Sequence, residues 1–353
     1  MNQTLSRKLT AAAAAAAAIC LLVFAPQTAE GVRHGLSLCG GALIPSLFPF
    51  MALALFVGRS PAAGVLAGLA DPLCRRWLRL PGQLGPVVLM SLIGGYPVGA
   101  RMLGDLLRQK RITPEEALRC LRFAVFPAPS FALVTVGAGI LGSVKAGAVL
   151  FGAHLLWALV LGRMQGRRHP LPPPVPPAGN PCLPPGAALV EGTAAAVEGM
   201  LSICGFALVF SALAAVPRHL GLDGVPLALL WGLLEVTGGV FACGGLNWTA
   251  AAFLVPFLVS FGSVSVLCQL AVCLDCPALS PGALLKGRLA QGLLCSLTAG
   301  PLLLGLAPAQ AAWQTAVQPL AGPSSVLSSA ALLGLCSLLL FGLAPARPEP
   351  DKF

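Results

Sequence analysis

Stretches of about 20 residues without a charged side chain recur along almost the whole chain. A helix of that length crosses the hydrocarbon core of a bilayer, and a soluble protein has too little interior to hide so many of them. The composition agrees, since 57% of the residues are hydrophobic, 10% are charged and the mean hydropathy is +0.86. The sequence therefore predicts an all-α integral membrane protein that crosses the bilayer several times.

Two apolar segments contain too many Gly and Pro residues for a continuous helix. Residues 80–100 include the run Ile-Gly-Gly-Tyr-Pro-Val-Gly-Ala at 93–100, and residues 225–245 carry Glu235 just before a Gly-Gly pair. Broken backbone at membrane depth is tolerated only where protein buries it or where it lines a cavity. Both segments are predicted to be re-entrant or broken helical hairpins rather than full spans.

The positions of Lys and Arg determine the predicted threading. With a cytoplasmic N-terminus and both broken segments re-entrant, the full spans are residues 9–26, 41–58, 118–140, 144–162, 198–217, 249–273, 287–306 and 325–345. Of the 22 Lys and Arg, only Arg33, Lys145 and Arg218 then lie outside, as the positive-inside rule requires. Eight spans return the C-terminus to the cytoplasm, and Arg288 falls in a cytoplasmic connector.

In this threading the two hairpins enter the membrane from opposite sides, and each half then adds two more spans. That is an inverted repeat, a common arrangement in secondary transporters, whose broken helices meet near the bilayer midplane. The predicted divisions are an N-terminal transmembrane helix (1–30), a first half (31–162), a Pro-rich cytoplasmic linker (163–186), a second half (187–306) and a C-terminal transmembrane helix with a tail (307–353). The first helix is interpreted as an uncleaved span rather than a signal peptide, because residues 27–30 make a poor cleavage site.

Several classes of function find no support in the sequence. The net charge of +10 comes from short connectors between spans without aromatic platforms, so no nucleic-acid partner is predicted. Cys273 and Cys276 form a lone C-x-x-C, and the four His are far apart, so no metal site and no cofactor are predicted. No catalytic residues are predicted, although a transferase with Arg and Glu at one membrane face remains an alternative. The oligomeric state is not predicted.

Glu235 is the first candidate for a functional residue, because it is the only acid well inside an apolar stretch. An ionisable group at membrane depth is by default functional, here in proton or cation coupling. The plainer alternative is a Glu that caps a broken helix end. The other candidates are the small residues at the hairpin tips and polar side chains in apolar surroundings: Gly94, Gly95, Tyr96, Pro97, Gly99, Ser130, Thr237, Gly238, Gly239, Ser263, Ser265 and Gln269. Each of these also has a structural reading, in which Gly permits close helix packing and the polar groups satisfy a helix backbone.

A set of motifs appears in an order that matches a known family. They are Pro-Ser-Leu-Phe-Pro-Phe at 45–50, Gly-Gly-Tyr-Pro-Val-Gly-Ala at 94–100, Thr-Pro-Glu-Glu at 113–116, Leu-Leu-Glu-Val-Thr-Gly-Gly at 233–239, Ser-Phe-Gly-Ser-Val-Ser-Val-Leu-Cys-Gln at 260–269 and Gly-Arg at 287–288. Together they resemble the YlbJ-type sporulation integral membrane proteins, which carry the nucleoside-recognition Gate domain. The resemblance covers the chain from about residue 31 to 306. It implies a multi-span protein of endospore-forming bacteria that is tied to the movement of dipicolinate.

The function expected from these observations is a transporter or permease for a small anionic metabolite. The resemblance makes dipicolinate, moved during endospore formation, the first choice of solute. The expected partners are the lipid bilayer of the cell or forespore membrane, a small anionic solute, and a coupling proton or cation. A nucleoside or ion transporter is an alternative. A membrane assembly factor for spore maturation that transports nothing is another, and it would have no water-accessible cavity.

Overall fold

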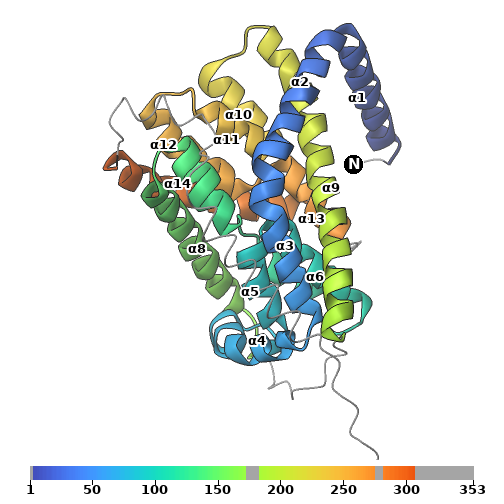
Figure 1. The fold of residues 1–353 in the computed structure, drawn as a ribbon, viewed down its shortest axis with the longest axis vertical. Coiled ribbons are helices and arrows are strands. Elements are labelled where there is room, and N and C mark those ends of the chain that lie inside the picture. Colours follow the sequence, from blue (N-terminus) through green and yellow to red (C-terminus); the bar gives the residue numbers. More distant parts are fainter. Residues whose placement is uncertain (1–2, 172–182, 275–280, 307–353) are drawn as a thin grey trace, which may run out of the picture.

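The computed structural model describes residues 3–171, 183–274 and 281–306, and every regular element in these ranges is a helix (Figure 1). The all-helical prediction is therefore confirmed for the described chain. The predicted span at 325–345, the rest of the C-terminal division and residues 172–182 of the Pro-rich linker lie outside the described residues.

Two long antiparallel helical stretches form one side of the molecule. One is continuous from Ala25 to Arg59 and comprises α2 (Ala25–Leu38), a π-helical turn η1 (Cys39–Leu43) and α3 (Ile44–Arg59). The other is α9 (Pro185–His219), which lies beside them in Figure 1. Small residues allow the close approach, since a Cβ on Gly31 would lie 2.9 Å from Ala212 Cα and one on Gly192 would lie 2.7 Å from Phe56 N.

Three further long segments pack mainly against one another. α8 (Val144–Gly166) matches the span predicted at 144–162, and α14 (Pro281–Leu304) packs against both α8 and α12 (Trp248–Phe261). α12 continues into α13 (Ser263–Leu274) after a break. By length and composition, four described stretches can cross a membrane: Ala25–Arg59, Val144–Gly166, Pro185–His219 and Trp248–Leu274.

The two segments predicted to be broken are both interrupted helices. α5 (Gly85–Gly94) and α6 (Tyr96–Arg108) meet at Gly95, and α10 (Gly224–Leu234) and α11 (Val236–Cys243) meet at Glu235. Each pair folds back on itself. The Gln83 side chain bonds the Arg111 carbonyl across the open end of the first pair, and in the second pair the backbones of Gly232 and Gly239 are in contact. The two hairpins approach the centre from the lower and upper parts of Figure 1.

Three predicted spans differ from the structure. Residues 118–140 are not one helix but α7 (Pro114–Leu121), an extended buried segment at 124–128, and η4 (Phe131–Ile140). Pro127 and Pro129 explain the interruption, because Pro removes a donor and restricts the residue before it. The predicted span 249–273 is interrupted at Gly262. The predicted span 9–26 corresponds to α1 (Gln3–Val23), whose apolar part, Ala14–Val23, is short.

The Arg-rich connectors converge at one end of the molecule, which we call the basic end. It includes the end of α3, α4 (Ala62–Asp71), η2 (Pro72–Leu78), η3 (Gly82–Leu84), and the ends of α6 and α8, and it lies at the bottom of Figure 1. Arg59 pairs with Asp105 at 3.1 Å, Arg119 donates to the Arg79 carbonyl at 2.7 Å, and Arg163 stacks over the Trp77 ring. These contacts bring basic residues from distant connectors onto one surface.

The contact between η4 and α8 gives a test of the packing. A Cβ on Gly147 would lie 2.9 Å from the backbone Cα atoms of both Gly137 and Leu133, whereas one on Gly152, on the same helix, would meet nothing within 4 Å. We expect Gly147→Ala to destabilise the protein by about 1–3 kcal/mol through overpacking. Gly152→Ala should be neutral or slightly stabilising. Thermal unfolding in detergent would measure both, and equal melting temperatures for the two variants would contradict the packing.

Candidate functional site

The tips of the two hairpins line one cavity near the centre of the described structure. The cavity holds about 480 Å³ of space free of protein atoms, including its opening. Its walls come from α3, η4, α9 and α13 as well as from the two tips, and most of them are apolar. Seven of the candidate residues line it: Gly94, Gly95, Tyr96, Pro97, Glu235, Thr237 and Gln269. Segments far apart in the sequence thus supply a compact set of polar groups to a largely apolar site.

Glu235 caps the helix that follows it. Its Oε1 accepts a hydrogen bond from the Thr237 backbone N–H at 2.9 Å, and its Oε2 accepts one from Gly238 at 2.6 Å. These are among the four N–H groups that the start of any helix leaves without partners. The side chain is buried, with 4% exposed, so the N-terminus of α11 is the local source of stabilisation for its charge. Glu235 therefore both caps a broken helix and faces the cavity.

The two glycines after Thr237 pack rather than line the cavity. Gly239 lies against the backbone of Gly232, and Gly238 lies under the indole ring of Trp231. A side chain at either position would displace a neighbouring helix or ring. The close contact between α10 and α11 therefore depends on Gly at both positions, which is the structural reading of these two candidates.

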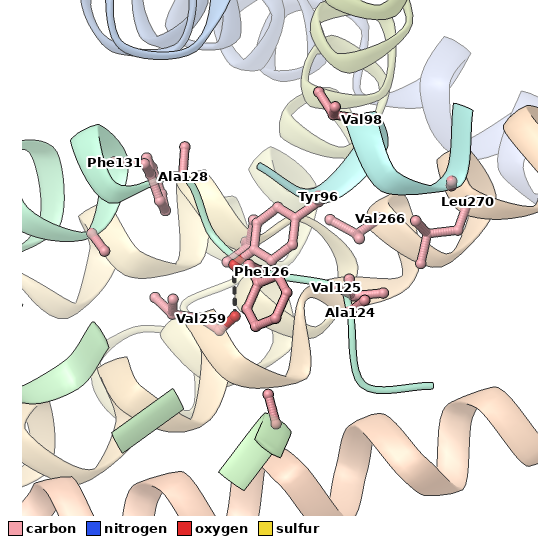
Figure 2. Close-up of a cluster of buried hydrophobic side chains, with 14 of the residues drawn as sticks. Tyr96, Val98, Ala124, Val125, Phe126, Ala128, Phe131, Val259, Val266 and Leu270 are labelled. Carbon is pink, nitrogen blue, oxygen red and sulfur yellow. Dashed lines mark hydrogen bonds between the residues drawn. The ribbon is translucent and has the colours of Figure 1, made fainter. Parts of the chain in front are cut away.

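The first tip has a backbone that only glycine adopts readily. Gly95 has φ +86° and ψ −173°, and it joins α5 to α6 without a side-chain cap. The Tyr96 hydroxyl donates to the Val259 carbonyl at 2.6 Å, and its ring packs among Phe126 and Val266 (Figure 2). Tyr96 thus ties the first hairpin to the end of α12 in the second half. Gly99 does not line the cavity but packs against the Ser91 side chain on α5.

The α12–α13 junction is a third broken helix, and the remaining serine candidates are structural. Gly262 and Ser263 have φ values of +88° and +72°. Ser263 Oγ accepts from the Val266 N–H at 3.4 Å, and Ser265 Oγ accepts from the Gln269 amide at 3.1 Å. Ser265 therefore orients a cavity-lining side chain without lining the cavity itself. Just before η4, Ser130 Oγ donates to the Ser46 carbonyl of α3 at 2.5 Å.

Arg288 is a central residue that the sequence reading assigned to a cytoplasmic connector. That assignment is wrong, because its side chain is fully buried at the α12–α13 break. Its guanidinium donates to the carbonyls of Phe261 at 3.1 Å, Val125 at 3.1 Å and Ser260. The last carbonyls of α12 lack helical partners, and they are the negative end of the helix dipole, so a cation fits there.

A buried polar network extends from Arg288. Arg288 also donates to Gln291 Oε1 at 2.7 Å, and Gln291 lies 3.4 Å from His154 Nε2. His154 Nδ1 is 2.9 Å from the Ser260 hydroxyl. Among the described residues, Arg288 and Glu235 are the only buried Lys, Arg, Asp or Glu side chains. In sequence, the signal for Arg288 is its place as the last charge before the long uncharged stretch at 289–346.

The fold and this site define a class of protein: a multi-span helical membrane protein whose broken helices surround a small central cavity. Residues 42–144, which contain α3, the first hairpin and η4, match the sequence model of the Gate family, described as nucleoside recognition. No solved structure matches the chain.

A curated relative agrees with this class. The chain is 25% identical to the sporulation integral membrane protein YlbJ of Bacillus subtilis (strain 168), over 83% of this chain and 81% of that protein. The resemblance predicted from the motifs is therefore confirmed. The protein is an integral membrane protein that is similar to YlbJ over most of its length and to the Gate model over residues 42–144.

Replacing Arg288 tests its role at the α12–α13 break. Arg288→Met would leave the Phe261 and Ser260 carbonyls without their donor, and it would leave the Val125 carbonyl with only the His154 ring nitrogen, 3.2 Å away. At roughly 1 kcal/mol or more for each unpaired carbonyl, we expect a loss of about 2 kcal/mol in stability. Lys286→Met, an exposed change on the same helix, should shift stability by less than about 0.5 kcal/mol.

The measurement is thermal unfolding in detergent, supported by the purified yield of folded protein. Arg288→Lys serves as a second variant, because an ammonium cannot bond all of the same carbonyls at once, and it should fall between the other two. A Met variant as stable as the parent would show that the carbonyls find other partners.

Proposed function

We propose that this protein is a secondary-transport-type permease whose solute site is the central cavity. The observation that carries the proposal is the convergence of two broken-helix tips, one from each half of the chain, on the same cavity. Secondary transporters bind their solutes at such junctions of discontinuous helices. A membrane assembly factor that transports nothing has no need for such a site.

The proposal includes an inverted repeat. In it, the basic end faces the cytoplasm in accordance with the positive-inside rule, and the two hairpins enter from opposite sides. The eight spans include one at 325–345. The arrangement of α5–α6 in the lower part of Figure 1 and α10–α11 in the upper part supports this threading.

Thiol labelling of intact cells tests the threading. A single cysteine at Gln109, exposed at the basic end, should react with a membrane-impermeant reagent only after the cells are opened. A single cysteine at Gly221, exposed at the opposite end, should react in intact cells. Labelling of Gln109→Cys in intact cells would show that the basic end does not face the cytoplasm, and it would contradict the proposed orientation.

The proposed solute is a small anionic metabolite. The N-termini of α6 and α11 begin at the cavity wall, and both carry partial positive charge. While its carboxylate is ionised, Glu235 repels an anionic solute in the cavity. An anion is therefore expected to enter together with a proton on Glu235, which makes proton coupling part of the proposal. Dipicolinate is the first solute to test, and this choice rests on the resemblance to sporulation membrane proteins.

Solute accumulation by Glu235 variants, measured in proteoliposomes across an imposed pH gradient, tests the proton coupling. Glu235→Gln keeps the size but cannot ionise, and it offers an amide N–H₂ where the carboxylate accepted a bond from α11. We expect proton-driven dipicolinate accumulation to fall at least tenfold. Glu235→Asp keeps the charge and an N-cap side chain, and it should retain a larger share of the transport.

Two controls make the result decisive. Each variant must be inserted and monodisperse at the parent's yield, and counterflow exchange without a gradient must be measured beside accumulation. A Gln variant that accumulates dipicolinate as well as the parent at every pH would leave Glu235 as a structural cap only.

A nucleoside is the second candidate solute. The Gate description points to it, and the cavity offers the rings of Tyr96 and Phe131 together with the Gln269 amide. Aromatic faces and an amide suit a nucleobase, which stacks and pairs through its edge. Uridine or adenosine should then compete with the labelled solute, or be transported when dipicolinate is not.

A further inference from the structure

A second and larger cavity opens at the basic end. It holds about 1220 Å³ of space free of protein atoms, including its opening, and lies between α3, α4, α5, α6 and the start of α9. Unlike the central cavity, it has many polar lining residues: Arg59, Gln83, Asp105, Gln109, Arg111 and Glu191. Such walls favour water and hydrated solutes, whereas the central cavity has one charged residue in a mostly apolar wall.

The two cavities lie one above the other along the same helices. On α3, Met51 lines the central cavity and Leu55 lines the basic one, one helical turn further on. At about 1.5 Å of rise per residue, this separation is about 6 Å. On α6, Pro97 and Met102 stand in the same relation, about 7.5 Å apart. The material between the cavities is therefore only one to two layers of side chains thick.

The residues of this partition are small or flexible. A Cβ on Gly94 would lie 3.0 Å from Ala54 and 2.6 Å from the Val98 side chain on α6, and Gly199 of α9 lies beside the Met51 sulfur. On the basic side, the Met102 methyl lies over Gly58. Methionine side chains repack at little cost, and glycine and alanine surfaces let helices slide past each other. The partition is closed in this structure, since Met51, Ala54 and Leu55 are all buried.

We propose that the basic cavity is the vestibule through which the solute passes between the central cavity and the cytoplasm, and that the partition formed by Met51, Ala54, Leu55 and Val98 is the gate between them. This inference rests on the proposed transport function. To that function it adds a route, from the cytoplasm to the solute site, and a segment that must open along it. It also gives a role to the basic cavity, which shares no lining residue with the solute site.

The test uses cysteine variants and a membrane-impermeant, negatively charged thiol reagent of the sulfonate type. Gly58→Cys places a thiol inside the vestibule, where it would meet only the mobile end of Met102. Gly64→Cys is the matched control, because it is exposed at the same end and its Cβ meets nothing within 4 Å. Leu47→Cys places a thiol in the central cavity beyond the partition. The parent, treated identically, corrects for the native cysteines.

The expected result has three parts. The reagent added on the cytoplasmic side should label Gly58→Cys and Gly64→Cys, and it should label Leu47→Cys at least tenfold more slowly. Dipicolinate transport should fall at least tenfold after Gly58→Cys is labelled, and it should not change after Gly64→Cys is labelled. Labelling of Gly58→Cys with a smaller alkylating reagent should reduce dipicolinate transport less, because the smaller adduct fills less of the vestibule.

Two failures are distinguishable. If the parent protein transports neither dipicolinate nor nucleosides, the proposed function fails, and the vestibule fails with it. If the parent and unlabelled Gly58→Cys transport, but labelled Gly58→Cys keeps its unlabelled rate, or Leu47→Cys reacts as fast as Gly58→Cys, only the vestibule and its gate are overturned.

Discussion

Backbone groups that lose their helical partners inside an apolar interior must find others, and this constraint organises the structure. At the second hairpin tip, Glu235 supplies acceptors for two N–H groups of α11. At the end of α12, Tyr96 and Arg288 supply donors for the carbonyls of three successive residues, 259 to 261. An unpaired buried backbone group costs about 1–3 kcal/mol, so each of these side chains stabilises a break that would otherwise be unfavourable. The two buried charges are therefore matched to opposite ends of helices, an acid at an N-terminus and a base at a C-terminus.

This arrangement also explains why the cavity lies where it does. Helices that stop inside the bundle leave space that continuous helices would fill. Tyr96 lies at the tip of the first hairpin, and its hydroxyl donates to the Val259 carbonyl near the end of α12 in the second half. A shift of the first hairpin would therefore remove a hydrogen bond from the end of α12. Under the proposed transport function, a solute between the tips would contact elements from both halves, so its binding could favour one arrangement of both.

The sequence predicted the elements whose local composition demands them. The density of Gly and Pro at residues 80–100 and the lone acid Glu235 within an apolar stretch both mark broken helices, so both hairpins and several cavity residues could be foreseen. The α12–α13 break could not, because a single Gly-Ser pair within apolar residues also occurs in continuous membrane helices. The hydropathy of residues 118–140 predicts a span that the structure does not have, since average hydropathy does not register that Pro127 and Pro129 interrupt the backbone. Arg288 was counted as a loop charge because its partners, from Val125 to Phe261, are distant in sequence.

The two buried charges differ in one respect that bears on how the protein is made. Glu235 is satisfied by residues two and three positions further along the chain, so its cap can form as soon as α10 and α11 leave the ribosome. Arg288 depends on carbonyls that were synthesised earlier, in the segment at 124–128 and at the end of α12. A charged side chain is costly in a helix that enters the lipid alone, by roughly 2.5–3.5 kcal/mol. Insertion of α14 is therefore expected to follow the docking of α12 against the segment at 124–128, so that the carbonyl partners of Arg288 are already in place when this helix enters the bilayer.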